Sequence, residues 1–237
     1  MSARSQTTHW SLVLAARGGA TESSRDALTR LCELYWYPIY VFVRRRGHSA
    51  EDARDLTQGY FARLLEKGYL DDVPPEAARF RSFLFASVSR FLSNARDRAG
   101  PARSGGGRTP ISLDTESAEQ RYRIEPADNL TPEKVFEKQW ALALLDRALG
   151  RLQEEHPAGQ AAARFQRLRP YLSGEEPGAA QREIAEELGM TEGALRQAID
   201  RLRKRFGEVL REEIRQTVAE PDAVDGELRH LLSSLSE

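Results

Sequence analysis

The sequence predicts an all-α protein with two helical domains joined by a flexible linker, the second of which contains a helix-turn-helix. Apolar residues recur at spacings of three and four over most of the chain, which is the period of one helix face. No stretch shows the strict alternation that is typical of a half-buried strand. Residues 100–129 break the helical pattern with Gly105-Gly106-Gly107 and three prolines, and this break marks the linker.

The N-terminal half is expected to hold four helices. Three of them are expected at 10–16, 24–46 and 80–98. The second has a kink or interruption near Pro38, because proline clashes with the preceding turn of a helix. The remaining helix starts at Ser49, with Asp52 three residues later in an arrangement like a capping box. Residues 71–78, which contain two prolines, are predicted to be a loop.

The C-terminal half begins with Thr131-Pro132, where proline occupies the first position of a helix. Another helix is expected at about 158–172. Residues 227–235 are expected to form a short amphipathic helix whose leucines make a stripe. We expect this tail to be regulatory and to dock on its own chain or on a partner. The expected domain ranges are 1–99, 100–130 for the linker, 131–217, and 218–237 for the C-terminal extension.

The stretch from Gln181 to Phe206 predicts the helix-turn-helix. Two helical patterns meet at Gly189, which can adopt the positive φ angle that a tight turn between helices requires. Ala185 is small enough for two helices to cross closely, and the hydroxyl of Thr191 can cap the second helix. In this motif the second helix enters the major groove of DNA.

The charge of the second helix agrees with DNA binding. Five basic and two acidic residues lie between Glu192 and Phe206, in a chain whose formal net charge is −1. The alternative interpretation is an amphipathic helix with a solvated basic face.

The residue types on this helix suggest which DNA groups they contact. Arginine pairs with guanine and glutamine with adenine, whereas basic residues further along such a helix contact phosphates. The predicted contacts to the upstream DNA element are Thr191, Arg196, Gln197, Arg201, Arg203 and Lys204.

Composition argues against several other classes. No apolar run is long enough to span a bilayer, and residues 1–5 lack the apolar core of a secretion signal. The single Cys32 excludes an internal disulfide and a multi-cysteine zinc site, and the four histidines lack ligand spacing. We therefore expect a cytoplasmic protein with no metal, no cofactor and no membrane insertion. An enzyme is the least expected class, because no nucleophile–base pair or phosphate-binding loop is present.

Four segments of the N-terminal half form a recognisable series: Tyr35-Trp36-Tyr37-Pro38-Ile39-Tyr40, Arg44-Arg45-Arg46, Ala53 to Phe61, and Phe80-Arg81-Ser82-Phe83-Leu84. The pattern Asp-Leu-x-Gln-x-x-Phe at 55–61 is the most specific piece. The series resembles the second conserved region of bacterial sigma factors, in particular the small, two-domain extracytoplasmic-function group. The resemblance covers roughly 28–98 and 142–210. The tail and the opening segment are similar to a planctomycete-type subgroup with an extended C-terminus.

The resemblance implies that the chain binds core RNA polymerase and directs it to promoters. It implies polymerase contacts at Asp55, Gln58 and Arg63, for which an ordinary solvated helix face is the alternative. It also implies a pocket for a flipped base of the melted promoter element, and arginines that hold the DNA backbone. The residues assigned to this second site are Arg79, Phe80, Arg81, Ser82, Arg90, Arg96 and Arg98. Phe83 and Phe91 are instead expected in the core.

Three positions depart from the family pattern. Tryptophan is common where Phe83 stands, asparagine is common near Ser89, and a second arginine is common where Ala198 stands. The recognised bases are therefore expected to differ from the common ones. The acidic residues of the linker, which include Glu119, either thread toward the RNA path as the family linker does or serve solubility alone.

The partners expected from the resemblance are core RNA polymerase and promoter DNA, with an inhibitor (anti-sigma) protein or a regulatory kinase as further candidates. Two other classes remain open at this point. One is a stand-alone helix-turn-helix regulator, which would need a dimer interface and a palindromic operator. The other is an adaptor that binds polymerase without reading DNA.

Overall fold

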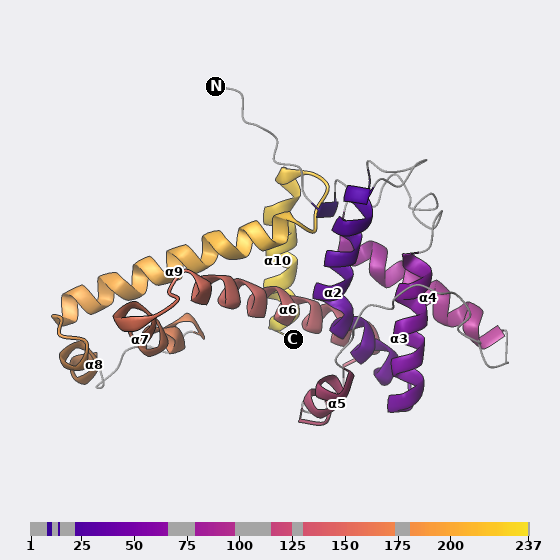
Figure 1. Ribbon diagram of the computed structural model, residues 1–237, viewed down its shortest axis with the longest axis horizontal. Helices are drawn as coiled ribbons and strands as arrows, with labels where there is room; N and C mark the ends of the chain where they lie inside the picture. Colours follow the sequence, from indigo (N-terminus) through magenta and orange to yellow (C-terminus); the bar gives the residue numbers. More distant parts are fainter. Residues whose placement is uncertain are drawn as a thin grey trace, which may run out of the picture. The chain divides into compact units, whose positions relative to one another are not determined.

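The computed structural model describes residues 9–10, 14, 22–65, 79–97, 115–124, 130–173 and 181–236. These residues form helices, and the only extended pairing among them is an isolated bridge between Arg79 and Val218 (Figure 1). The predicted all-α class is confirmed. None of the helices in the described ranges combines the length and the apolarity needed to cross a membrane.

The chain divides into two compact units that differ from the expected domain ranges. The first unit consists of Met1–Ala143 together with Ile214–Glu237, and the second of Leu144–Glu213. The C-terminal extension therefore belongs to the same unit as the N-terminal helices. Helices α6 (Pro132–Glu154) and α9 (Glu192–Arg215) each contribute residues to both units.

Three helices of the first unit follow the sequence signals closely. They are α2 (Glu22–Arg45), α3 (Ala50–Leu64) and α4 (Phe80–Asp97). Pro38 lies inside α2, and Tyr35 just before it has the non-helical angles φ −122° and ψ 20°, so the expected kink is present. Ser49 caps α3, since its Oγ accepts the backbone N–H of Asp52 at 3.1 Å. The first helix expected from the sequence lies largely outside the described residues, as do the loop at 71–78 and most of the linker.

An aromatic cluster forms the core of the first unit. Tyr35 on α2 stacks on Trp140 of α6 at a centroid distance of 4.2 Å, and Phe80 at the start of α4 lies 5.1 Å from Trp10. All four side chains are buried. Cys32 is buried in the same unit, and burial raises the pKa of its thiol. The first half of α6, expected to belong to the helix-turn-helix domain, is thus part of this core.

The predicted linker contains a helix. Helix α5 (Thr115–Ile124) packs on α2 through Glu119, whose carboxylate accepts hydrogen bonds from the Tyr40 hydroxyl at 2.6 Å and from Arg44 Nε at 3.1 Å. The guanidinium of Arg121 lies over the ring of Tyr37, 4.4 Å from its centroid. Glu119 is therefore bound by two side chains of α2, and this part of the linker is a packed helix.

The C-terminal extension forms the expected tail helix. The extension continues from α9 through a short 3-10 helix, η3 (Pro221–Ala223), into α10 (Val224–Leu235). Glu227 of α10 connects the extension to the start of α4, since its carboxylate lies 2.7 Å from Arg81 Nε and 3.2 Å from Arg79 Nε. Docking on its own chain, one of the expected outcomes for this tail, is what the structure shows.

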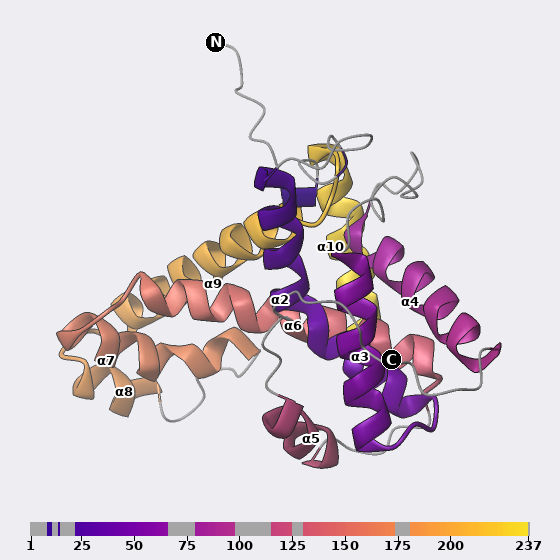
Figure 2. The same cartoon turned by 45° about the vertical axis from the view of Figure 1, so that its right-hand side comes forward.

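In the second unit, short helices pack on one side of α9 (Glu192–Arg215). These are α7 (Gly159–Leu168), η2 (Arg169–Ser173) and α8 (Gln181–Glu187), together with the second half of α6 (Figure 2). Phe165 of α7 and the α9 residues Leu195 and Ile199 are buried between them. The helical stretch expected at 158–172 is present as α7 followed by η2.

Candidate nucleic-acid interface

The turn between α8 and α9 has the geometry that its sequence predicted. Gly189 has a φ of +63°, a conformation that side chains with a Cβ rarely adopt. The N–H groups of Gly189 and Met190 bond back to Glu186 O at 3.0 Å and to Ala185 O at 2.9 Å, which closes α8. Ala185 is buried in the second unit, as its small size led us to expect. The helix-turn-helix is therefore formed by local backbone bonds and one small buried residue.

Thr191 caps α9. Its Oγ1 accepts the backbone N–H of Ala194 at 3.2 Å, and its carbonyl accepts the N–H of Leu195 at 2.9 Å. Glu192 in the first turn lies at the positive end of the helix dipole, where a carboxylate is favourable. The expected cap is confirmed. Because Thr191 is itself exposed, its place at the start of α9 leaves it accessible to DNA.

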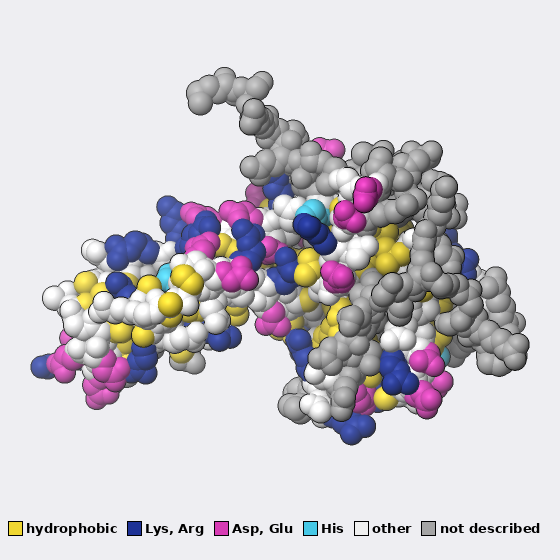
Figure 3. Space-filling view, viewed as in Figure 1, with side chains coloured by type: hydrophobic (Ala, Val, Ile, Leu, Met, Phe, Trp, Pro, Cys, Tyr) yellow, Lys and Arg dark blue, Asp and Glu magenta, His cyan; other side chains and the backbone are white. Residues whose placement is uncertain are grey.

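The outward face of α9 carries the residues expected to read bases. Arg196, Gln197 and Lys204 are exposed, whereas Leu195 and Ile199 are buried against the rest of the second unit. The side chain of Arg196 is 64% exposed and lies 3.6 Å from Glu192, one turn away, which orders it along the helix surface. Figure 3 shows Lys and Arg side chains along α9, interspersed with Asp and Glu.

Two of the residues expected to contact phosphates, Arg201 and Arg203, also lie next to other parts of the second unit. Arg203 donates from Nε to the backbone carbonyl of Tyr171 at 3.0 Å, so it fastens η2 to α9. Arg201 lies at the edge of a cleft of about 440 Å³ between α7 and α9. Arg201, Arg203 and Lys204 are all exposed, so all three phosphate contacts stay predictions. The sequence could not show the carbonyl of Tyr171 beside Arg203, because Tyr171 lies 32 residues earlier in the chain.

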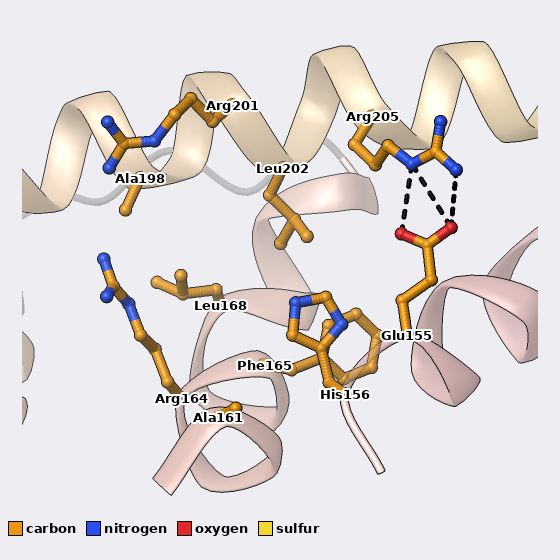
Figure 4. Close-up of a pocket in the computed structure, with 10 residues that line it drawn as sticks. All are labelled: Glu155, His156, Ala161, Arg164, Phe165, Leu168, Ala198, Arg201, Leu202 and Arg205. Carbon is orange, nitrogen blue, oxygen red and sulfur yellow. Dashed lines mark hydrogen bonds and ion pairs between the residues drawn. The ribbon is translucent and has the colours of Figure 1, made fainter.

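The cleft beside Arg201 was not anticipated from the sequence. Leu202 and Phe165 line it, the ring of His156 stacks on Phe165 at 5.1 Å, and Arg164 reaches toward the same end as Arg201 (Figure 4). At the other end Arg205 pairs with Glu155 at 2.6 Å. Hydrogen bonds from Arg205 lower the pKa of the Glu155 carboxyl, so the pair stays charged and closes that end of the cleft.

The residues assigned to the melted promoter element are not brought together on one surface. Phe80 and Arg81 are buried in the first unit, which corrects the expectation that they line an open pocket. Ser82 and Arg90 are exposed on α4, and Arg79 is half-buried. The side chain of Arg96 and the whole of Arg98 lie outside the described residues.

The residues assigned to polymerase binding lie on α3. Asp55 is exposed, while Gln58 and Arg63 are half-buried. Asp55 lies 3.6 Å from Arg54, its neighbour in sequence. The three residues are on one helix, with Asp55 the most accessible of them.

Residues 174–205 match the family model for winged helix-turn-helix DNA-binding domains. In the described residues that follow the match, 206–236, α9 continues to Arg215 and leads to α10, so this part of the chain contains no β-hairpin wing. No curated protein and no solved structure shows a significant match to the chain. The chain thus carries a helix-turn-helix DNA-binding segment, which supports a role in the regulation of transcription.

Proposed function

We propose that this protein is a sigma factor of the extracytoplasmic-function type, a non-catalytic protein that binds core RNA polymerase and directs it to promoters. The observation that carries the proposal is the position of the Asp55 to Phe61 motif on α3. Its apolar members Tyr60 and Phe61 are buried in the first unit, while the side chain of Asp55 is 69% exposed. The motif therefore both completes a core and offers a polar face to a partner, in a chain that carries a separate DNA-binding segment.

In vitro transcription tests this proposal directly. Core RNA polymerase is combined with the protein on a library of promoters, and initiation is expected only when both are present. Equal initiation with and without the protein on every promoter would contradict the proposal. Specific binding to a palindromic site in the absence of polymerase would instead identify a stand-alone regulator.

The double variant Asp55→Ala, Gln58→Ala is expected to weaken binding to core polymerase by about tenfold or more, because a few residues of an interface carry most of the binding energy and the loss of about 1.4 kcal/mol is tenfold in affinity. Asp55 is exposed and Gln58 is only half-buried, and alanine favours a helix, so helix content is expected to be unchanged. Binding is measured by titration of labelled core enzyme. Glu51→Ala is the matched control, since Glu51 is an exposed acid on the same helix. An equal loss in the control would assign the effect to net charge alone.

Arg196→Ala and Lys204→Ala are expected to affect DNA binding differently. A bidentate contact from Arg196 to one base gives a cost of about 1–3 kcal/mol at one upstream base pair and relaxes the preference there. Lys204→Ala is expected to lower affinity evenly across sequences and to flatten the salt dependence. Affinity for a set of single-base promoter variants at several salt concentrations measures both. Uniform weakening by both variants would show that Arg196 does not read a base.

A further inference from the structure

A buried carboxylate on α10 is held by two arginines at the start of α4. Glu227 is 1% exposed, and its Oε1 accepts the Nε–H of Arg81 at 2.7 Å while Oε2 accepts Nη2–H at 3.3 Å. Arg79 adds a third contact, from its Nε to Oε2 at 3.2 Å. Two guanidinium groups thus converge on one anion, with Arg81 in the side-on, two-point geometry that suits carboxylate and phosphate equally.

The surroundings of this anion site come from α6 and α10. Glu137 on α6 accepts two hydrogen bonds from Nη1 of Arg81, at 2.5 and 2.6 Å, and lies 2.7 Å from Nε2 of His230. Removing Glu227 therefore leaves two guanidinium groups facing a single carboxylate. The site then carries a net positive charge and has one unfilled anion position.

Helix α10 buries only one charged and one apolar side chain within the first unit. Its buried residues are Glu227 and Leu231, whereas Leu232 is 52% exposed. A helix of 12 residues is marginal on its own, and desolvation offsets part of the attraction in the buried ion pairs that hold it. A segment with few buried apolar contacts belongs to the part of a structure that opens at low free-energy cost.

We propose that Arg79 and Arg81 form a phosphate-binding site for a DNA strand, which Glu227 occupies while α10 is docked. Release of α10 exposes both arginines, and a backbone phosphate takes the place of the carboxylate. We choose DNA as the source of the phosphate because the same chain carries a helix-turn-helix DNA-binding segment. The inference rests on the proposed function for its choice of a single strand, because a sigma factor acts on opened duplex. Helix α10 is then an internal competitor that limits strand binding by the free protein.

The first test compares Glu227→Gln with the wild-type protein for binding of a labelled single-stranded oligonucleotide, measured by fluorescence anisotropy without polymerase. Glutamine keeps the size of the side chain but removes the charge that competes with phosphate. Affinity is expected to rise by about fivefold or more. Glu220→Gln is the matched control, because Glu220 is exposed in the same extension and its substitution changes the net charge equally. The control is expected to bind as the wild type does.

The second test removes α10 by truncation after Glu220, which leaves Thr217 and Val218 in place. This variant is expected to gain more affinity than Glu227→Gln does, and adding Arg79→Gln and Arg81→Gln is expected to abolish the gain in both backgrounds. Circular dichroism shows whether the truncated chain folds; if it does not, the full-length Glu227→Gln variant alone decides.

Unchanged strand binding in Glu227→Gln would overturn the proposal, as would a gain that survives the loss of both arginines. In either case the buried ion pairs would serve only to fix α10 to the first unit. Because polymerase is absent from the assay, a gain in strand binding is observable even if the protein fails to support initiation. Failure of the proposed function and failure of this inference are therefore separate results.

Discussion

Trp140→Ala is expected to destabilise the first unit by about 3–5 kcal/mol, the usual cost of removing a large aromatic side chain from a core. Trp140 is 1% exposed and stacks on Tyr35 at 4.2 Å, with Phe80 at 6.0 Å and Phe136 at 6.3 Å. Its loss leaves a void among rings contributed by α2, α4 and α6. These helices are held by their other contacts, so they cannot all move to fill the void. A loss of this size is a large share of the stability of an ordinary domain.

Urea unfolding followed by tryptophan fluorescence measures this effect. All three tryptophans lie in the first unit, so Trp10 and Trp36 still report on it in the variant. Trp36→Ala is the control, because that side chain is only half-buried and meets Tyr37 and Tyr40 edge-on. Trp140→Phe is expected to cost less, since it keeps a ring and removes a buried indole N–H that has no hydrogen-bond partner among the described residues. Equal effects of Trp140→Ala and Trp36→Ala would contradict the assigned core.

Local signals in the sequence were sufficient for the helix-turn-helix. The positive φ of Gly189, the cap at Thr191 and the buried Ala185 each depend on residues within a few positions, so spacing and residue type predicted them. The same holds for the Ser49 cap and the kink near Pro38. Wherever backbone geometry is decided within one or two turns, the sequence was a sufficient guide.

The sequence could not show which charged residues are buried, because their burial depends on contacts between segments that are far apart in the chain. Arg81 looks like any exposed arginine beside a loop, and it is buried because Glu227, 146 residues further on, pairs with it. The leucine stripe of the tail predicted docking, but its partner surface depended on that ion pair. Glu119 likewise appeared to be one acid in a flexible linker until Tyr40 and Arg44 held it. A buried charge is recognisable only together with its partner.

The division into units was also hidden in the sequence. Helix α6 begins with Pro132 and continues without a break to Glu154, so nothing in its pattern marks the point near Ala143 where it passes from the first unit to the second. Helix α9 does the same near Glu213. A continuous apolar stripe on a helix shows that a face is covered, but it does not show which segment covers it.

Glu213→Ala is expected to destabilise the second unit by about 2–3 kcal/mol, because a buried carboxylate that accepts charged hydrogen bonds contributes more than an exposed one. Glu213 on α9 has a side chain only 3% exposed, and it accepts from Arg147 Nε at 2.6 Å and from Arg151 Nη1 at 2.7 Å, both on α6. The hydrogen bond to Glu213 raises the pKa of Arg151, so this guanidinium stays charged beside the carboxylate.

The neighbouring Glu212 bonds Arg151 at the same 2.7 Å but is 49% exposed. Glu212→Ala is therefore expected to cost less than about 1 kcal/mol. Chemical unfolding followed by circular dichroism compares the two variants, and equal losses would show that burial does not decide the strength of the α6–α9 connection.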